Sequence, residues 1–175
     1  MKASVNSKAW HAVYTKSRAE KKVMLELEYQ GIEVFLPLQK KLRQWSDRKK
    51  WVETPLISGY IFVNISKFEY DKVLQTLGVV SYVRFEGKAA IIPDDQIDNI
   101  KKLLRQNELE INVSYENFSK GDAIEVISGP LMGLKGSLAF IKGKKRVAVI
   151  LEQLNLSLTV DLPLNEVRKI ETVGI

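Results

Sequence analysis

The residues that could support catalysis or bind a metal are few in this chain. His11 is the single histidine and there is no cysteine, so a metal site would depend on carboxylates. Asp94, Asp95 and Asp98 form an acidic group, but they fall in the first turn of a predicted helix, where the helix dipole favours acidic residues. The glycine-rich phosphate loops and nucleophile motifs of common enzymes are missing from the sequence. We therefore expect a protein that is not an enzyme, with no cofactor and no metal site.

Basic residues are concentrated in one short stretch. Residues 1–106 contain 19 Lys and Arg against 12 Asp and Glu, whereas the remaining residues contain 8 against 9. Within the first part, Asp47 alone offsets a cluster of basic residues: Lys40, Lys41, Arg43, Arg48, Lys49 and Lys50. Such a cluster favours a polyanionic partner, usually nucleic acid. The composition fits equally well a hairpin tip that its charges keep soluble.

Aromatic residues form a second candidate site. Residues 55–65 are apolar at both alternating sets of positions, and Tyr60 and Phe62 share one of these sets. Trp10 and Tyr14 would join them if the strand predicted at residues 9–15 pairs with this segment. An exposed patch of this kind is typical of a protein interface. The alternative is that a helix covers this face and the rings belong to the core.

The elements that position these residues are marked by periodicity and by start and stop signals. Strands are predicted at residues 9–15, 32–45, 51–65, 79–85 and 89–92, with a hairpin tip at residues 46–49. Capping boxes at residues 17–20 and 66–69 and Pro93 start the helices, and Gly31 and Gly78 end the first two. The order βαββαβα predicts an α+β fold, a sandwich over a mainly antiparallel sheet.

The rest of the chain has a different pattern. Residues 108–119 show no clear period and are interpreted as a linker. Beyond them, short strands are predicted at residues 122–127, 136–141, 146–151, 156–162 and 167–170. A turn with Gly129, Pro130, Gly133 and Gly136 joins the first two, since glycine reaches positive φ and proline presets a turn. This pattern predicts a small, partly open β-barrel.

The chain has no apolar run near the roughly 20 residues of a membrane span, and its first residues lack the apolar core of a signal peptide. We therefore expect a soluble, cytoplasmic protein without membrane attachment. We also expect the protein to be a monomer.

Two motifs in this order resemble the NusG family of transcription elongation factors. Residues 10–15 (W-H-A-V-Y-T) and 55–63 (P-L-I-S-G-Y-I-F-V) resemble the NGN domain, although Ile57 and Ser58 depart from the family's P-L-F-P-G-Y-V-F-V. Residues 126–136 (V-I-S-G-P-L-M-G-L-K-G) resemble the KOW domain. The resemblance implies an NGN-type α/β sandwich over residues 1–107, the linker at 108–119, and a small all-β, SH3-like KOW barrel over residues 120–175.

Two further stretches resemble a specialised group within that family. Residues 14–23 (Y-T-K-S-R-A-E-K-K-V) and 42–50 (L-R-Q-W-S-D-R-K-K) are similar to UpxY-type paralogues, which act as antiterminators at capsular or exopolysaccharide operons. The resemblance implies an operon-specific factor that binds RNA polymerase and suppresses pausing and termination. A housekeeping NusG-type factor is the alternative, and a free-standing RNA-binding module is the rival from another class.

The resemblance also implies roles for the candidate residues. The β′ clamp helices of RNA polymerase would be contacted by exposed aromatic side chains: Tyr14, Tyr60, Phe62 and Phe35. The basic hairpin would lie near upstream or non-template DNA, where Trp45 or Trp51 could stack on an unpaired base or pack across the strands. The KOW domain, expected as a β-barrel and not as a helical mask, would recruit ribosomal protein S10 or the termination factor Rho through Leu131, Met132 and Phe140.

Overall fold

The computed structural model describes residues 7–106, 109–115, 121–141, 144–162 and 166–170, with the side chains of residues 140–145 left out. Its contacts divide the chain into two compact units, Met1–Asp94 and Asp95–Ile175. None of the helices in the described ranges is long and apolar enough to cross a membrane.

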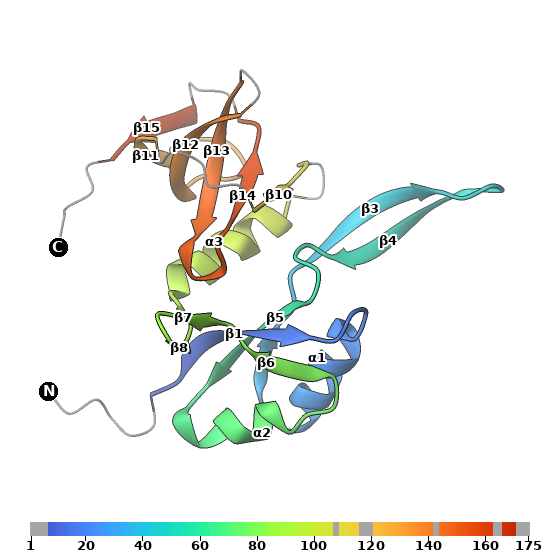
Figure 1. Cartoon of the computed structure of the whole chain (residues 1–175). Helices are drawn as coiled ribbons and strands as arrows, with labels where there is room; N and C mark the ends of the chain where they lie inside the picture. Colours follow the sequence, from blue (N-terminus) through green and yellow to red (C-terminus); the bar gives the residue numbers. More distant parts are fainter. Residues whose placement is uncertain (1–6, 107–108, 116–120, 142–143, 163–165, 171–175) are drawn as a thin grey trace, which may run out of the picture. The chain divides into compact units, whose positions relative to one another are not determined.

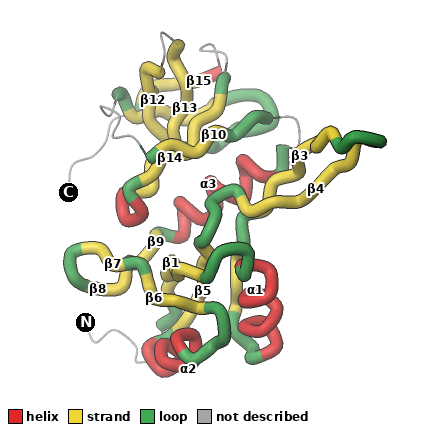
Figure 2. The backbone as a smooth tube through the Cα atoms, turned by 45° about the vertical axis from the view of Figure 1, so that its right-hand side comes forward, coloured by secondary structure: helices red, strands yellow, loops and turns green. Residues whose placement is uncertain are grey.

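The first unit is built on an antiparallel sheet in the order β2 (Glu33–Phe35), β5 (Tyr60–Ile65), β1 (Ala9–Thr15), β6 (Val79–Tyr82). The short strand β9 (Ile91–Ile92) also pairs with β1, and β7 (Arg84–Phe85) pairs with β8 (Lys88–Ala89). Strands β3 (Leu38–Gln44) and β4 (Lys49–Pro55) pair only with each other in the described part of the chain. They extend away from the sheet of their unit as a long hairpin (Figures 1 and 2).

Helices α1 (Glu20–Tyr29) and α2 (Tyr70–Leu74) share a core with one face of this sheet. Val23 and Leu27 of α1 and Val73 of α2 are fully buried there against strand residues such as Ile61 and Val63. Val23 and Leu27 are four positions apart on the helix, and Ile61 and Val63 are two positions apart on the strand. Each of these pairs therefore lies on one face of its element. The predicted α+β sandwich on a mainly antiparallel sheet is confirmed.

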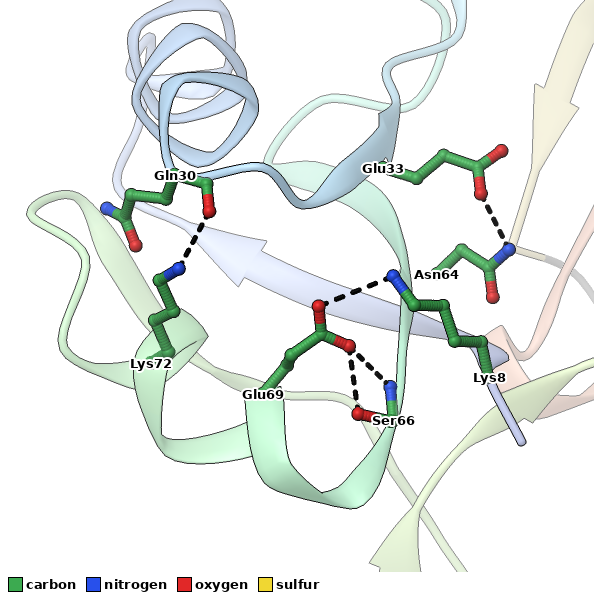
Figure 3. A network of polar contacts seen from close by, with 7 residues as sticks. All are labelled: Lys8, Gln30, Glu33, Asn64, Ser66, Glu69 and Lys72. Carbon is green, nitrogen blue, oxygen red and sulfur yellow. Dashed lines mark hydrogen bonds and ion pairs between the residues drawn. The ribbon is translucent and has the colours of Figure 1, made fainter. Parts of the chain in front are cut away.

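The two predicted capping boxes have different outcomes. The one before α2 is present: a 3₁₀ turn (Lys67–Glu69) leads into the helix, and the Glu69 carboxylate accepts hydrogen bonds from the Ser66 N–H and Oγ, both at 2.9 Å (Figure 3). The one before α1 is wrong. The N-cap there is Ala19 without a side-chain cap, and Arg18 has a left-handed φ of 61°. The Glu20 carboxylate instead accepts the Gly59 N–H at 2.8 Å, so a tertiary contact replaces the local cap.

Further polar contacts hold α2 to its surroundings. The Lys8 ammonium lies 3.3 Å from the Glu69 carboxylate, and Lys72 Nζ donates to the backbone oxygen of Gln30 at the end of α1, at 2.7 Å (Figure 3). Gly31 follows with a φ of 80°, which confirms the predicted glycine stop of this helix.

The second unit contains α3 (Asp94–Leu104) and an antiparallel sheet in the order β10 (Asn112–Ser114), β14 (Leu156–Val160), β13 (Lys144–Leu151), β12 (Lys135–Ile141), β11 (Ala123–Val126), β15 (Val167–Lys169). A short 3₁₀ turn, Glu152–Leu154, links β13 to β14. The five strands predicted after residue 120 are therefore confirmed. A Cβ at Gly136 would lie 2.5 Å from the Ala148 carbonyl oxygen, so close strand packing requires a glycine there.

Two features of the second unit differ from the sequence analysis. Part of the predicted linker, β10, is a strand paired with β14. Helix α3, placed by sequence within residues 1–107, groups by its contacts with the β domain: Lys102 Nζ donates to Gly133 O at 2.9 Å, and Asn99 Nδ2 to Lys135 O at 3.2 Å. Both differences arise from contacts between residues distant in the sequence, which local patterns do not encode.

Candidate polymerase and nucleic-acid interfaces

The aromatic residues of β1 and β5 meet across the centre of the first sheet. The strand register places Tyr14 opposite Tyr60 and Ala12 opposite Phe62. The two tyrosine rings lie 4.6 Å apart between centroids, and the Tyr60 hydroxyl donates to the Tyr14 hydroxyl at 3.0 Å. The two strands do pair, which was the condition for Tyr14 to join Tyr60, and the pairing brings both tyrosines together.

The expected exposure of this face is wrong for two of its members. Phe62 is 0% exposed and Tyr60 is 9% exposed, whereas Tyr14 is 38% exposed. Phe35 is half-buried and stacks on Phe62 at 6.0 Å, while Trp10 meets Phe35 edge-on at 6.5 Å. Tyr14 is thus the one ring of the four predicted contacts with more than a third of its surface in solvent. The apolar character of residues 55–65 at both sets of positions was the signal for burial on both faces.

The predicted basic cluster lies on the hairpin, where its members are exposed. Cross-strand pairing places Arg43 opposite Lys50 and Lys40 opposite Glu53. Trp51 pairs with Leu42, and Trp45 lies at the tip, where its backbone N–H donates to the Arg48 backbone oxygen at 2.8 Å. Both tryptophans are exposed, so Trp51 packs across the strands only against another exposed side chain.

The predicted contacts of the KOW domain fall into different environments. Leu131 is 1% exposed and belongs to the core of its unit, so the expectation that it offers a surface to a partner is wrong. Met132 is 66% exposed in the turn between β11 and β12. Phe140 lies on β12 opposite Lys145, and its side chain is outside the described residues.

His11 has a structural environment. Its Nδ1–H donates to the Ala90 carbonyl oxygen at 3.1 Å, and its ring meets Tyr82 edge-on at 5.8 Å. Burial lowers the pKa of His11, and the bond to Ala90 opposes this only in part. Across the described side chains, no three His, Asp or Glu residues gather as a metal site would require.

Known proteins are similar to this chain in sequence and in fold. Residues 8–101 match the family model described as NusG, transcription termination factor. The transcription termination/antitermination protein NusG of Staphylococcus carnosus is 24% identical, over 97% of this chain and 100% of its own. That of Borreliella burgdorferi is 22% identical, over 94% and 100%. A solved structure showing domain interaction in Thermotoga maritima NusG has 27% identity and a TM-score of 0.50, and covers 94% of this chain and 98% of its own.

Proposed function

This chain belongs to the NusG family of transcription termination and antitermination factors, and we propose that it binds elongating RNA polymerase and suppresses pausing and termination. The observation that carries the proposal is the first unit, which holds most of the family match and presents both an exposed tyrosine on a rigid sheet and a projecting basic hairpin. The protein acts as a cytoplasmic monomer, through binding and without chemistry of its own.

The polymerase contact is centred on Tyr14 and faces the β′ clamp helices. Tyr60 lies beside it on β5 and donates to its hydroxyl, and Phe62, further along β5, stacks on Phe35 of β2. Tyrosine on a rigid support is a common anchor in protein interfaces, since it contributes a large area at a small cost in conformational entropy. Buried Phe62 and Tyr60 therefore position the contact, and Tyr14 makes it.

The effect on transcription follows from differential affinity. A ligand shifts a conformational equilibrium only by as much as it prefers one state. A preference of about 1.4 kcal/mol for the elongating polymerase over its paused state changes the ratio of the two about tenfold. The basic hairpin adds contacts to upstream or non-template DNA, which position the factor without reading sequence.

Substitution of Tyr14 tests the polymerase contact. We expect Tyr14→Ala to weaken binding to core RNA polymerase about tenfold or more, as loss of an interface anchor does, while Tyr14→Phe retains most of the affinity. Phe68→Ala is the matched control, because Phe68 is also an exposed ring of the first unit. Affinity is measured by titration of polymerase, and pausing by single-round transcription. Full binding by Tyr14→Ala, or equal losses for Tyr14→Ala and Phe68→Ala, would contradict this contact.

The specialised role is operon-specific antitermination at polysaccharide genes, supported by the resemblance of residues 14–23 and 42–50 to UpxY-type paralogues. The alternative is a housekeeping NusG-type factor. Genome-wide crosslinking separates them: occupancy restricted to a few long operons supports the specialised role, and occupancy that follows polymerase over most transcribed genes supports the housekeeping one.

The second unit recruits a further partner, ribosomal protein S10 or Rho, through the exposed turn that carries Met132.

The rival function, a free-standing RNA-binding module, would show strong salt-dependent RNA binding and no co-purification with polymerase.

A further inference from the structure

The two ends of the sheet in the second unit are protected in different ways. One end is the short strand β15, whose Arg168 guanidinium lies 3.0 Å from the Glu125 carboxylate. The next residue, Lys169, lies 2.6 Å from the Asp122 carboxylate. Short length and charged side chains are common ways of preventing an edge strand from pairing with another chain. The other end of the sheet is β10, which lies beside β14 (Figures 1 and 2).

Strand β14 has no such protection of its own. Its five residues, Leu156–Val160, include neither a charged residue nor a proline, and its pairings with β13 and β10 contain no register shift. Each of the five is at most 3% exposed, including the polar residues Ser157 and Thr159. A regular, uncharged strand readily pairs with an added strand when its edge is open. The edge of β14 is therefore protected by β10 and not by its own sequence.

Strand β10 is attached to β14 by few contacts. Its pairs with β14 are Asn112–Thr159, Val113–Leu158 and Ser114–Ser157. The Thr159 hydroxyl donates to the Asn112 backbone oxygen at the long distance of 3.4 Å, and all three residues of β10 are only half-buried. Ile111, directly before the strand, is 6% exposed and anchors it in the unit. The pairing thus covers three of the five residues of β14 and leaves its two end residues outside.

The sequence of β10 indicates what the edge of β14 accepts. Residues 111–115 (I-N-V-S-Y) alternate between apolar and small polar side chains and carry no charge. An extended segment of another protein with this pattern could pair with all five residues of β14. In strand addition of this kind, the main-chain hydrogen bonds supply affinity and the alternate side chains supply specificity.

We propose that β10 is a displaceable strap over the edge of β14, and that this edge binds an extended, uncharged segment of a partner protein when β10 leaves. Because β10 belongs to the same chain, it competes at an effective concentration that is about millimolar. A partner therefore displaces it only by pairing with more of β14 than β10 does. The edge is separate from the turn that carries Met132, and the proposal does not depend on polymerase binding.

A disulfide between the two strands tests the proposal. The chain has no cysteine, and Ser114 lies directly opposite Ser157, so Ser114→Cys/Ser157→Cys introduces a single pair of thiols. Opposed Cβ atoms in a sheet are about 4.5–5.5 Å apart, close to the separation in a disulfide. The oxidised protein keeps the strap closed, and the same protein in its reduced form is the matched control.

The probe is a synthetic peptide with the sequence of residues 111–115, and a scrambled peptide of the same composition is its control. Binding to the labelled full chain is followed by NMR titration, which detects weak complexes. We expect the peptide to shift the amide signals of β14 in the reduced protein, and to bind the oxidised protein at least about tenfold more weakly, since the binding-competent fraction falls. Equal binding by the two forms, or no binding to either, would overturn the proposal.

A second variant opens the strap without a disulfide. Successive N–H groups of a strand point to opposite sides, so Val113→Pro/Ser114→Pro removes one N–H that points to β14. Tyr115→Pro, outside β10, is the control. We expect the double variant to remain folded and to bind the peptide about tenfold more tightly than the wild type, which corresponds to a strap closed for about nine-tenths of the time.

Met132→Ala separates the edge from the exposed turn, and it should bind the peptide as the wild type does. Loss of peptide binding in this variant would place the site at the turn and overturn the proposal. A folded Val113→Pro/Ser114→Pro variant that binds no more tightly than the wild type would also contradict it, because β10 would then not restrict the edge.

Discussion

His11 couples its protonation to folding at mildly acidic pH through its lowered pKa. Burial lowers its pKa, so the folded protein disfavours the imidazolium ion. As the pH falls below about 6.5, the ordinary value, the unfolded chain takes up a proton first. The contribution of neutral His11 to the free energy of unfolding is therefore fully present above that pH. It decreases as the pH falls towards the lower pKa of the folded protein, and below that pKa the loss is constant.

Replacement of His11 should remove this dependence. We expect His11→Gln to flatten the decrease in free energy of unfolding between pH 7.5 and 5.5, an interval of about two units around the ordinary pKa of histidine. The measurement is urea unfolding at both values. Glu69, whose pKa is lowered mainly by the Ser66 N–H, acts at more acidic pH and does not interfere. An undiminished decrease in the variant would show that another group titrates.

Phe62 and Tyr14 differ in burial, although both were predicted as surface contacts. Phe62→Ala should lower the free energy of unfolding by about 3–5 kcal/mol, because it leaves a cavity beside Phe35. Tyr14→Ala should cost far less, since Tyr14 is partly in solvent. Denaturant melts of the two variants give the comparison. Equal stability of both would mean that Phe62 is not part of the core.

At the scale of elements, one tertiary hydrogen bond joins the start of α1 to the loop before β5. The Glu20 carboxylate accepts the Gly59 N–H at 2.8 Å, and the Gly59 oxygen accepts the Thr15 N–H at 2.9 Å. We expect Glu20→Ala to lower the free energy of unfolding by about 1–3 kcal/mol, because the partly buried Gly59 N–H loses its acceptor. Glu28→Ala, an exposed change on the same helix, should stay within about 0.5 kcal/mol. Similar values for both would contradict the role of this bond.

The same element shows where sequence reasoning reaches its limit. Helix periodicity, the Ser66 box and the Gly31 stop depend on residues a few positions apart, and each was predicted correctly. The start of α1 was not, because Glu20 bonds to Gly59, 39 positions away. Strand β10 was missed for a similar reason: it has three residues and is defined by its pairing with β14.

The candidate sites show the same division. The strand pattern predicted the hairpin and placed the basic residues on it. The two motifs led to the correct family. Side-chain exposure was not predictable from one strand, since Phe62 of β5 stacks on Phe35 of β2, which in turn meets Trp10 of β1, and these rings come together only in the folded sheet.

At the scale of the whole molecule, the chain combines an α+β unit and a β-rich unit. The proposed contacts lie on different elements: Tyr14 for polymerase, the basic hairpin for nucleic acid and the Met132 turn for a further partner. This division predicts that the contacts can be lost one at a time. Variants of Tyr14 should spare nucleic-acid binding, and variants of Lys41 and Arg43 should spare polymerase binding.

The most direct measurement is an NMR titration of the labelled full-length protein with a fragment of the β′ clamp helices. We expect chemical-shift changes that cluster at Tyr14 and at its neighbour Tyr60, with hairpin residues such as Lys41 unaffected. The absence of shifts around Tyr14, with the second unit folded as a β domain, would contradict polymerase binding through this face.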